Sequence, residues 1–189
     1  GTCFPQAAAQ GATWDPELAY EIGEAMGREC KNQHVDILLR PGVNMKRSPL
    51  CGRNFEYYSE DPWLSSEMGA KFIEGVQSQR VAANLKHFVC NNQEYERMTT
   101  NAVVDERTFH EMYLRVFQLI LQKSDPWTIM TSYNKVNGKW VHENKYIMDI
   151  LRKEFGYNGL VMSDAFAVHY KEDKVEGHKC GLDVELAEE

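Results

Sequence analysis

Four short apolar runs alternate with amphipathic stretches along the chain, and this alternation predicts an α/β fold. The runs are VDILL (35–39), VAANLKHF (81–88), WTIMTSY (127–133) and GLVMS (159–163). Near-continuous apolar strands are typical of a parallel sheet that is covered on both faces. We therefore expect parallel strands that are joined by helices.

The stretches between the runs carry clear helix signals. Residues 15–30 and 61–77 both begin Asp-Pro, with Asp suited to the N-cap and Pro to the first helical position. Residues 105–123 begin at Asp105, and residues 144–156 end on Gly156, a favoured helix terminator. Apolar stripes are predicted for two of these helices, formed by Leu18, Ile22, Ala25 and Met26 and by Phe109, Met112, Tyr113, Val116, Phe117 and Ile120.

Repeated strand–helix units with right-handed crossovers form either a doubly wound sheet or a (β/α) barrel. GTCFP (1–5) and GLDVEL (181–186) are two further candidate strands, which makes about six. A closed barrel needs eight, so a barrel built from this chain is expected to be incomplete. Residues 40–60 form a long irregular segment after a strand, and such loops in compact domains are usually functional.

Composition and charge exclude several classes of protein. The chain has 43% hydrophobic and 26% charged residues, as in an ordinary globular domain. Its formal net charge of −7 argues against nucleic acid or an anionic membrane as a partner, and no apolar run predicts a membrane span. The chain opens on Gly1 with neither an initiator Met nor a signal peptide. We expect a fragment or a processed chain, with no compartment indicated.

No metal or phosphate motif is present. The five cysteines lie far apart without a Cys-x-x-Cys pair, which favours buried small side chains over zinc or redox sites. Glycine-rich phosphate loops and the Gly-x-Ser-x-Gly elbow are absent. His87 and Asp164 are not in a zinc spacing, and the basic pair Lys46-Arg47 is typical of a solvated loop.

Polar side chains follow the predicted strands at ends that would meet at one rim of a parallel sheet. They are Arg40, Asn44, Arg53, Lys86, His87, Asn91, Asn92, Glu94, Arg97, Tyr133, Asn134 and Asp164. A carboxylate ringed by Arg, Lys, His and Tyr suits a polyhydroxylated ligand, because the donors hold hydroxyl groups and the cations favour the ionised Asp. An ionised Asp that faces a sugar ring can act as a nucleophile.

The main candidates among these residues also have purely structural interpretations. Asp164 can cap a helix that begins after the strand, as Asp often does. Arg53 can form a loop salt bridge with Glu56, and Lys86 can extend from a strand end into solvent. Tyr133 can be a core aromatic.

Four segments resemble glycoside hydrolase family 3, specifically its β-glucosidases: GRNFEYYSEDP (52–62), KHFVCNNQEYER (86–97), SYNKVNG (132–138) and GLVMSDAFAVH (159–169). The likeness extends from TCFPQAAAQGATWDPELA near the start to GLDVEL near the end. It implies a TIM-like (β/α) barrel, no cofactor, and retaining hydrolysis of small β-glycosides or oligosaccharides by two carboxylates. It assigns the nucleophile to Asp164 and hydroxyl binding to Arg53, Lys86, His87, Arg97 and Tyr133.

The chain departs from the family pattern at one residue of the site. Ala165 stands where the family usually has a Trp that lines the sugar subsite, which affects the expected affinity and aglycone preference. The KHFVCN stretch disfavours the N-acetylglucosaminidase subgroup, which carries a Lys-His-Phe-Pro-Gly-His-like segment and an Asp-His dyad.

Two other parts of the family pattern lie outside residues 1–189: an upstream Asp-Gly-Pro segment, and an acid/base Glu in a second α/β sandwich domain of the same polypeptide. Glu56, Glu94 and Glu143 are weaker candidates for that acid. We therefore expect residues 1–189 to be inactive alone, and an inactive carbohydrate-binding fragment is the alternative.

Lys86 and His87 raise a geometric question. Neighbouring residues on a regular strand point to opposite faces of the sheet. Both can reach one ligand only if the strand contains a bulge or an unusual peptide bond.

Overall fold

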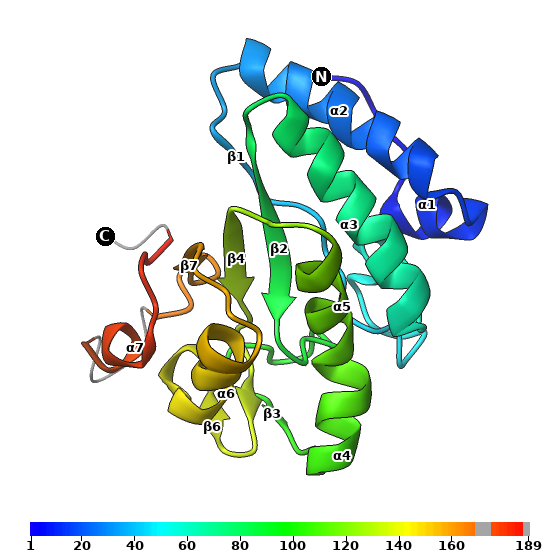
Figure 1. Cartoon of the computed structure of the whole chain (residues 1–189). Helices are drawn as coiled ribbons and strands as arrows, with labels where there is room; N and C mark the ends of the chain where they lie inside the picture. The colour runs from blue at the N-terminus through cyan, green and yellow to red at the C-terminus, as the bar shows by residue number, and fades with distance from the viewer. Residues whose placement is uncertain (169–174, 187–189) are drawn as a thin grey trace.

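A four-stranded parallel sheet forms the centre of the computed structural model, which describes residues 1–168 and 175–186. Its strands are β1 (Ile37–Leu38), β2 (Ala82–Phe88), β4 (Thr128–Thr131) and β7 (Leu160–Met162), in the order β1-β2-β4-β7 (Figure 1). All three pairings are parallel. The four apolar runs therefore form strands as predicted. Within the described residues the sheet stays open, as expected of an incomplete barrel.

The two additional strands expected at the ends of the chain do not form as predicted. The backbone N–H of Thr2 donates to the Glu29 carboxylate at 2.9 Å, which holds the first residues on helix α2 (Pro16–Asn32) and away from the sheet. An unpredicted helix, α1 (Ala7–Thr13), follows. In GLDVEL only Val184 joins the sheet, through one parallel bridge to Met162. Of the six strands expected, the described residues therefore form four in the main sheet and one bridge, and the barrel is incomplete as predicted.

Helices α2 and α3 (Pro62–Ser78) begin at their Asp-Pro signals and lie side by side (Figure 1). The side chain of Asp61 accepts the backbone N–H of Trp63 at 3.0 Å, as an N-cap does. The predicted stripe of α2 is confirmed in part: Ile22 and Met26 pack against the core, whereas Leu18 is exposed. The most buried positions of the helix include Gly23, which was not predicted. Helix α3 approaches so closely that a Cβ at Gly23 would lie 2.4 Å from the Phe72 carbonyl oxygen.

The other two predicted helices each contain a π-helical turn. The first consists of α4 (Glu106–Thr108), a π turn at Phe109–Tyr113 and α5 (Arg115–Lys123). The second consists of α6 (Lys145–Asp149) and a π turn at Ile150–Glu154. Gly156 follows it with φ of +69°, which confirms the predicted terminator. The last helix described is α7 (Val175–Cys180), and two 3₁₀ turns lie at Asn54–Glu56 and Val141–Glu143.

A second, three-stranded sheet lies beyond the carboxyl ends of the main strands and was not predicted (Figure 1). Its strands are β3 (Asn101–Ala102), β5 (Lys135–Val136) and β6 (Lys139–Trp140). The pair β5–β6 is an antiparallel hairpin whose turn is Asn137-Gly138, with φ of +48° and +94°. Asn-Gly is the preferred sequence for such a turn.

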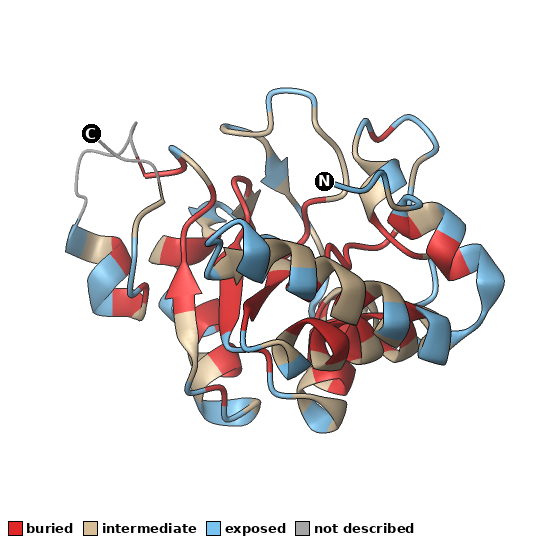
Figure 2. Ribbon diagram, turned by 90° about the horizontal axis from the view of Figure 1, so that it is seen from above, coloured by how far each residue is buried: buried red, intermediate tan, exposed pale blue. Residues whose placement is uncertain are grey.

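Buried positions gather along the strands and on the helix faces that contact them (Figure 2). The Phe88 ring of β2 packs edge-on against Phe117 of α5, with centroids 5.1 Å apart. Cys51, Cys90 and Cys180 are buried and unpaired, which confirms the packing role for those three. None of the helices in the described part of the chain is long and apolar enough to cross a membrane.

Candidate active site

Asp164 follows β7 after one intervening residue, Ser163, at the carboxyl edge of the sheet, and only 7% of it is exposed. Its Oδ1 accepts the backbone N–H of Ala165 at 2.8 Å, whereas its Oδ2 has no hydrogen-bond partner. Residues 165–168 form turns, so over the described range Asp164 does not cap a helix. His169, the last residue of the resembling segment, lies outside the described residues.

Cationic and polar groups surround this carboxylate. Oδ2 lies 3.5 Å from Nε2 of His87 and 4.0 Å from Nη1 of Arg53. Burial raises the pKa of Asp164 above its usual range, although the Ala165 N–H and the charges of Arg53 and Lys86 oppose this. The net effect is that the ionised form of Asp164 is less stabilised here than it would be in water.

Glu56 joins the two cations. Its Oε1 accepts a short hydrogen bond from Nε of Arg53, and its Oε2 lies 3.3 Å from Nζ of Lys86. Burial alone would raise the pKa of Glu56, but Arg53 and Lys86 together lower it. The predicted salt bridge between Arg53 and Glu56 is thus present, and it lies within the site. Lys86 pairs inside the protein and does not extend into solvent, and its burial lowers its pKa.

The side chains of Lys86 and His87 both lie in the site, Lys86 beside Glu56 and His87 beside Asp164. The Lys86–His87 peptide bond is cis, and the pairing of β2 with β4 shifts register between Leu85 and Phe88. Regular alternation is therefore interrupted here, as the sequence required. Two hydrogen bonds of 2.9 Å hold the His87 backbone to the Asn44 side chain. The imidazole is fully buried, and this burial, followed by the charges of Lys86, Arg53 and Arg97, lowers its pKa well below the usual value.

Arg97 and Tyr133 complete the group. The Arg97 guanidinium lies 4.3 Å from the centre of the Tyr133 ring and donates to Glu94 at 3.0 Å. The Tyr133 hydroxyl donates to the Ala165 carbonyl at 2.9 Å, and burial together with the charge of Asp164 raises the pKa of Tyr133 to about 12. The structure therefore brings all six predicted residues together. We call them the basin: Asp164, Arg53, Lys86, His87, Arg97 and Tyr133.

Other residues of the predicted rim have structural contacts elsewhere. Arg40 lies over the Phe72 ring at 5.7 Å, and the Asn92 side chain donates to the Met45 carbonyl. Asn134 donates to the Val89 carbonyl at 3.2 Å. Tyr57 contacts His87 but was not predicted, because nothing in the Tyr57-Tyr58 pair indicates which ring faces the site.

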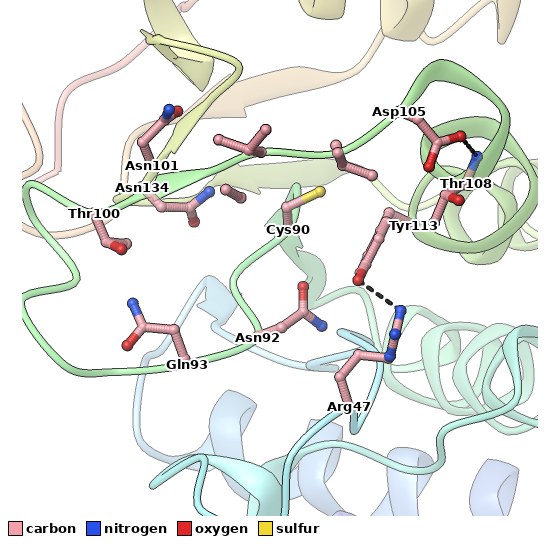
Figure 3. A pocket seen from close by; sticks show the side chains of 13 residues that line it. Arg47, Cys90, Asn92, Gln93, Thr100, Asn101, Asp105, Thr108, Tyr113 and Asn134 are labelled. Carbon is pink, nitrogen blue, oxygen red and sulfur yellow. Dashed lines mark hydrogen bonds between the residues drawn. The ribbon is translucent and has the colours of Figure 1, made fainter.

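A separate pocket of about 450 Å³ lies among Arg47, Cys90, Gln93, Thr100, Asp105 and neighbouring residues (Figure 3). None of the basin residues lines it. Its carboxylate, Asp105, accepts the Thr108 N–H at 3.0 Å as the cap of α4, a structural task. This pocket and the basin are therefore separate sites on the protein. Residues 1–168 and 175–186 contain no cluster of three His, Cys, Asp or Glu side chains that could hold a metal ion.

The model of the glycosyl hydrolase family 3 N terminal domain matches residues 1–188. This chain belongs to glycosyl hydrolase family 3. Similar proteins of the family include thermostable beta-glucosidase B of Acetivibrio thermocellus, at 52% identity, and exo-alpha-(1->6)-L-arabinopyranosidase of Bifidobacterium longum, at 46%. Both matches cover 98% of this chain and 24% of the relative.

Solved structures of family 3 confirm the fold. Beta-glucosidase 3B from Thermotoga neapolitana in complex with glucose matches with a TM-score of 0.95 and 49% identity, over 98% of this chain and 26% of that one. A Kluyveromyces marxianus beta-glucosidase matches with a TM-score of 0.93 and 39% identity, over 97% and 22%. The predicted family and the barrel-type fold are therefore confirmed. The chain spans about a quarter of these relatives.

Proposed function

We propose that the protein containing this chain is a retaining hydrolase of terminal β-linked glycosides, with Asp164 as nucleophile. Asp164 would attack the anomeric carbon and expel the aglycone, forming a covalent glycosyl-enzyme that water then hydrolyses. A second carboxyl group, about 5–5.5 Å away in retaining enzymes, would protonate the leaving oxygen and later activate the water. We assign that group to a part of the polypeptide outside residues 1–189, in a second domain.

One observation carries the proposal: a buried carboxylate oxygen at the sheet edge has no hydrogen-bond partner. Asp164 Oδ2 lies beside His87 and Arg53 at this edge without a hydrogen bond, which leaves it free to meet a ligand. His87 Nε2 and Asn91 Oδ1 are also buried without a partner. A polyol supplies both donors and acceptors for such atoms.

The remaining basin side chains suit the binding of sugar hydroxyl groups. Arg53, Lys86 and Arg97 are donors only, whereas the Tyr133 hydroxyl can donate or accept. They would fix the ring so that its anomeric carbon faces Asp164, which contributes through orientation. The relatives are named for glucosides and for an arabinopyranoside, so a panel of aryl glycosides should define the sugar.

A carbohydrate-binding fragment without catalysis is the alternative. This alternative is favoured because two nearby carboxylates are held in ion pairs. Glu56 pairs with Arg53 and Lys86, and Glu94 pairs with Arg97. Neither is placed to give up a proton to a leaving group. If residues 1–189 are isolated, this pairing predicts sugar binding with little turnover.

A 2-deoxy-2-fluoro β-glucoside tests the mechanism, because it traps the glycosyl-enzyme for mass spectrometry. We expect the label on the peptide that contains Asp164 in the full-length protein, and none in Asp164→Gly. Asp105→Asn, which changes a helix-capping carboxylate, should label like the wild type. Label on another residue, or near-normal turnover by Asp164→Gly, would exclude Asp164 as the nucleophile.

A further inference from the structure

A chain of buried hydrogen bonds connects His87 to side chains behind the basin. Nδ1 of His87 lies 3.0 Å from the Tyr57 hydroxyl, and that hydroxyl accepts from Nδ2 of Asn91 at 3.2 Å. Nδ2 of Asn91 also donates to Oε1 of Glu94 at 3.0 Å, and Oε2 of Glu94 accepts from Arg97 at 3.0 Å. We call this chain the tautomer relay: Glu94, Asn91, Tyr57 and His87.

The direction of each hydrogen bond in the relay can be derived from Glu94. A carboxylate paired with Arg97 can only accept, so the amide nitrogen of Asn91 must face it. The same nitrogen then donates its second proton to the Tyr57 hydroxyl. Because burial raises the pKa of Tyr57, the hydroxyl keeps its own proton, and the remaining partner for that proton is Nδ1 of His87.

This direction decides which ring nitrogen of His87 carries the proton. A neutral imidazole has one N–H, and an Nδ1 that accepts from Tyr57 leaves this proton on Nε2. Nε2 has no other hydrogen-bond partner and lies 3.5 Å from the unpartnered Oδ2 of Asp164. An N–H directed at a carboxylate is favourable, whereas two facing lone pairs repel each other.

One contact favours the opposite tautomer. Oδ1 of Asn44 lies 3.3 Å from Nδ1 of His87 and would accept a proton from it. That oxygen already accepts the backbone N–H of His87 at 2.9 Å. The Tyr57 hydroxyl lies closer to Nδ1, at 3.0 Å, and its own proton needs Nδ1 as an acceptor, so this hydroxyl decides the balance. Without it, Asn44 is the remaining side-chain partner of Nδ1.

We propose that Tyr57, oriented by Asn91 and Glu94, is a positioning residue that keeps the proton of His87 on Nε2. His87 then presents a donor to Asp164 and, resting on the proposed function, to a sugar hydroxyl in the basin. Tyr57 is fully buried, and its hydroxyl reaches the basin at His87. Its effect on the reaction is thus indirect.

Nitrogen NMR of the full-length protein labelled with [¹⁵N]histidine tests the proposal, because protonated and unprotonated ring nitrogens resonate far apart. His87→Gln identifies the signals of His87. We expect the protonated nitrogen to be Nε2 in the wild type and the Nδ1–H form to become populated in Tyr57→Phe. Tyr58→Phe is the matched control, since that adjacent hydroxyl is buried without a partner and its removal should change neither signal.

If His87 of the wild type carries its proton on Nδ1, or protons on both ring nitrogens, the proposal is overturned by the wild-type spectrum alone. An unchanged tautomer in Tyr57→Phe would overturn the role of Tyr57. On aryl β-glucosides, Tyr57→Phe should lose about tenfold in kcat/KM, as expected for one hydrogen bond, while Tyr58→Phe stays near the wild type. The NMR result does not depend on turnover, so the tautomer is decided even if the proposed hydrolysis fails.

Discussion

Removing the charge of Arg53 should make Asp164 harder to ionise and shift the acidic limb of the pH–rate profile upward. Nη1 of Arg53 lies 4.0 Å from Oδ2 of Asp164, and its charge opposes the effect of burial on the pKa of that carboxyl. Arg53→Gln removes this charge and keeps a hydrogen-bond donor. The pKa of Asp164, already raised, should therefore rise further.

The size of the shift follows from the separation of the two charges. Unit charges about 4 Å apart interact by about 1 kcal/mol in bulk water and about 4 kcal/mol at an effective dielectric constant near 20. Side-chain exposures of 17% for Arg53 and 11% for Asp164 place the pair between these limits. Since 1.36 kcal/mol corresponds to one pKa unit, we expect the acidic limb to move up by about one pH unit or more.

The assay is the pH dependence of kcat/KM for dinitrophenyl β-glucoside with the full-length protein. A good leaving group needs little acid assistance, so the acidic limb reports the ionisation of the nucleophile in the free enzyme. Arg97→Gln is the control: it also lowers kcat/KM, but its guanidinium contacts Glu94 and the Tyr133 ring, so the limb should stay in place. An unmoved or more acidic limb in Arg53→Gln would refute the electrostatic argument.

Three further predictions concern the site and its scaffold. Asp164→Asn should abolish most turnover yet unfold at a higher temperature than the wild type at pH 7. Because the pKa of Asp164 is raised in the folded state, this residue stabilises the fold fully below its unfolded pKa and loses that contribution as pH rises through the folded pKa. The gain in unfolding temperature of Asp164→Asn should therefore shrink toward acid pH, and an equal gain at all pH values would contradict this. Ala165→Trp should lower the KM for aryl glucosides about fivefold through ring stacking, and an unchanged KM would show that the indole finds no sugar to stack on. Gly75→Ala should lower the free energy of unfolding by about 2 kcal/mol although Ala favours helix by about 1 kcal/mol, because its Cβ would lie 2.2 Å from the Tyr20 carbonyl oxygen. Gly69→Ala in the same helix meets side-chain atoms, of Ile120 at 3.1 Å and Val43 at 3.3 Å, and should lose less; equal losses in urea unfolding would disprove the close-contact explanation.

The sequence predicted those parts of the fold that depend on local rules. Apolar runs and Asp-Pro caps act within a few residues, so the four main strands and the starts of α2 and α3 agree with the structure. The burial of Gly23 in α2 was not predicted, because this residue is buried by the approach of α3 and not by its own hydrophobicity. The β5–β6 hairpin carried a readable Asn-Gly turn signal that was not interpreted.

The sequence predicted which residues gather at the site but not the hydrogen bonds that link them to residues behind it. Strand ends and the family resemblance bring Asp164, Arg53 and His87 to one rim, and the structure confirms this placement. The contact between Tyr57 and His87 joins residues 30 positions apart in the chain. No periodicity encodes such a contact, since it depends on how the loop after β1 crosses the end of β2.

The proposed reaction needs a nucleophile and a general acid, and the basin residues differ in which of these tasks they can perform. A general acid must hold its proton at working pH, which needs a raised pKa. Glu56 has a lowered pKa because Arg53 and Lys86 hold its ionised form, so it cannot fill that role. Variants of basin residues should therefore lower kcat/KM by a similar factor for aryl glucosides with good and poor leaving groups. Loss of the acid should instead penalise poor leaving groups most, because only they need the proton when the glycosidic bond breaks.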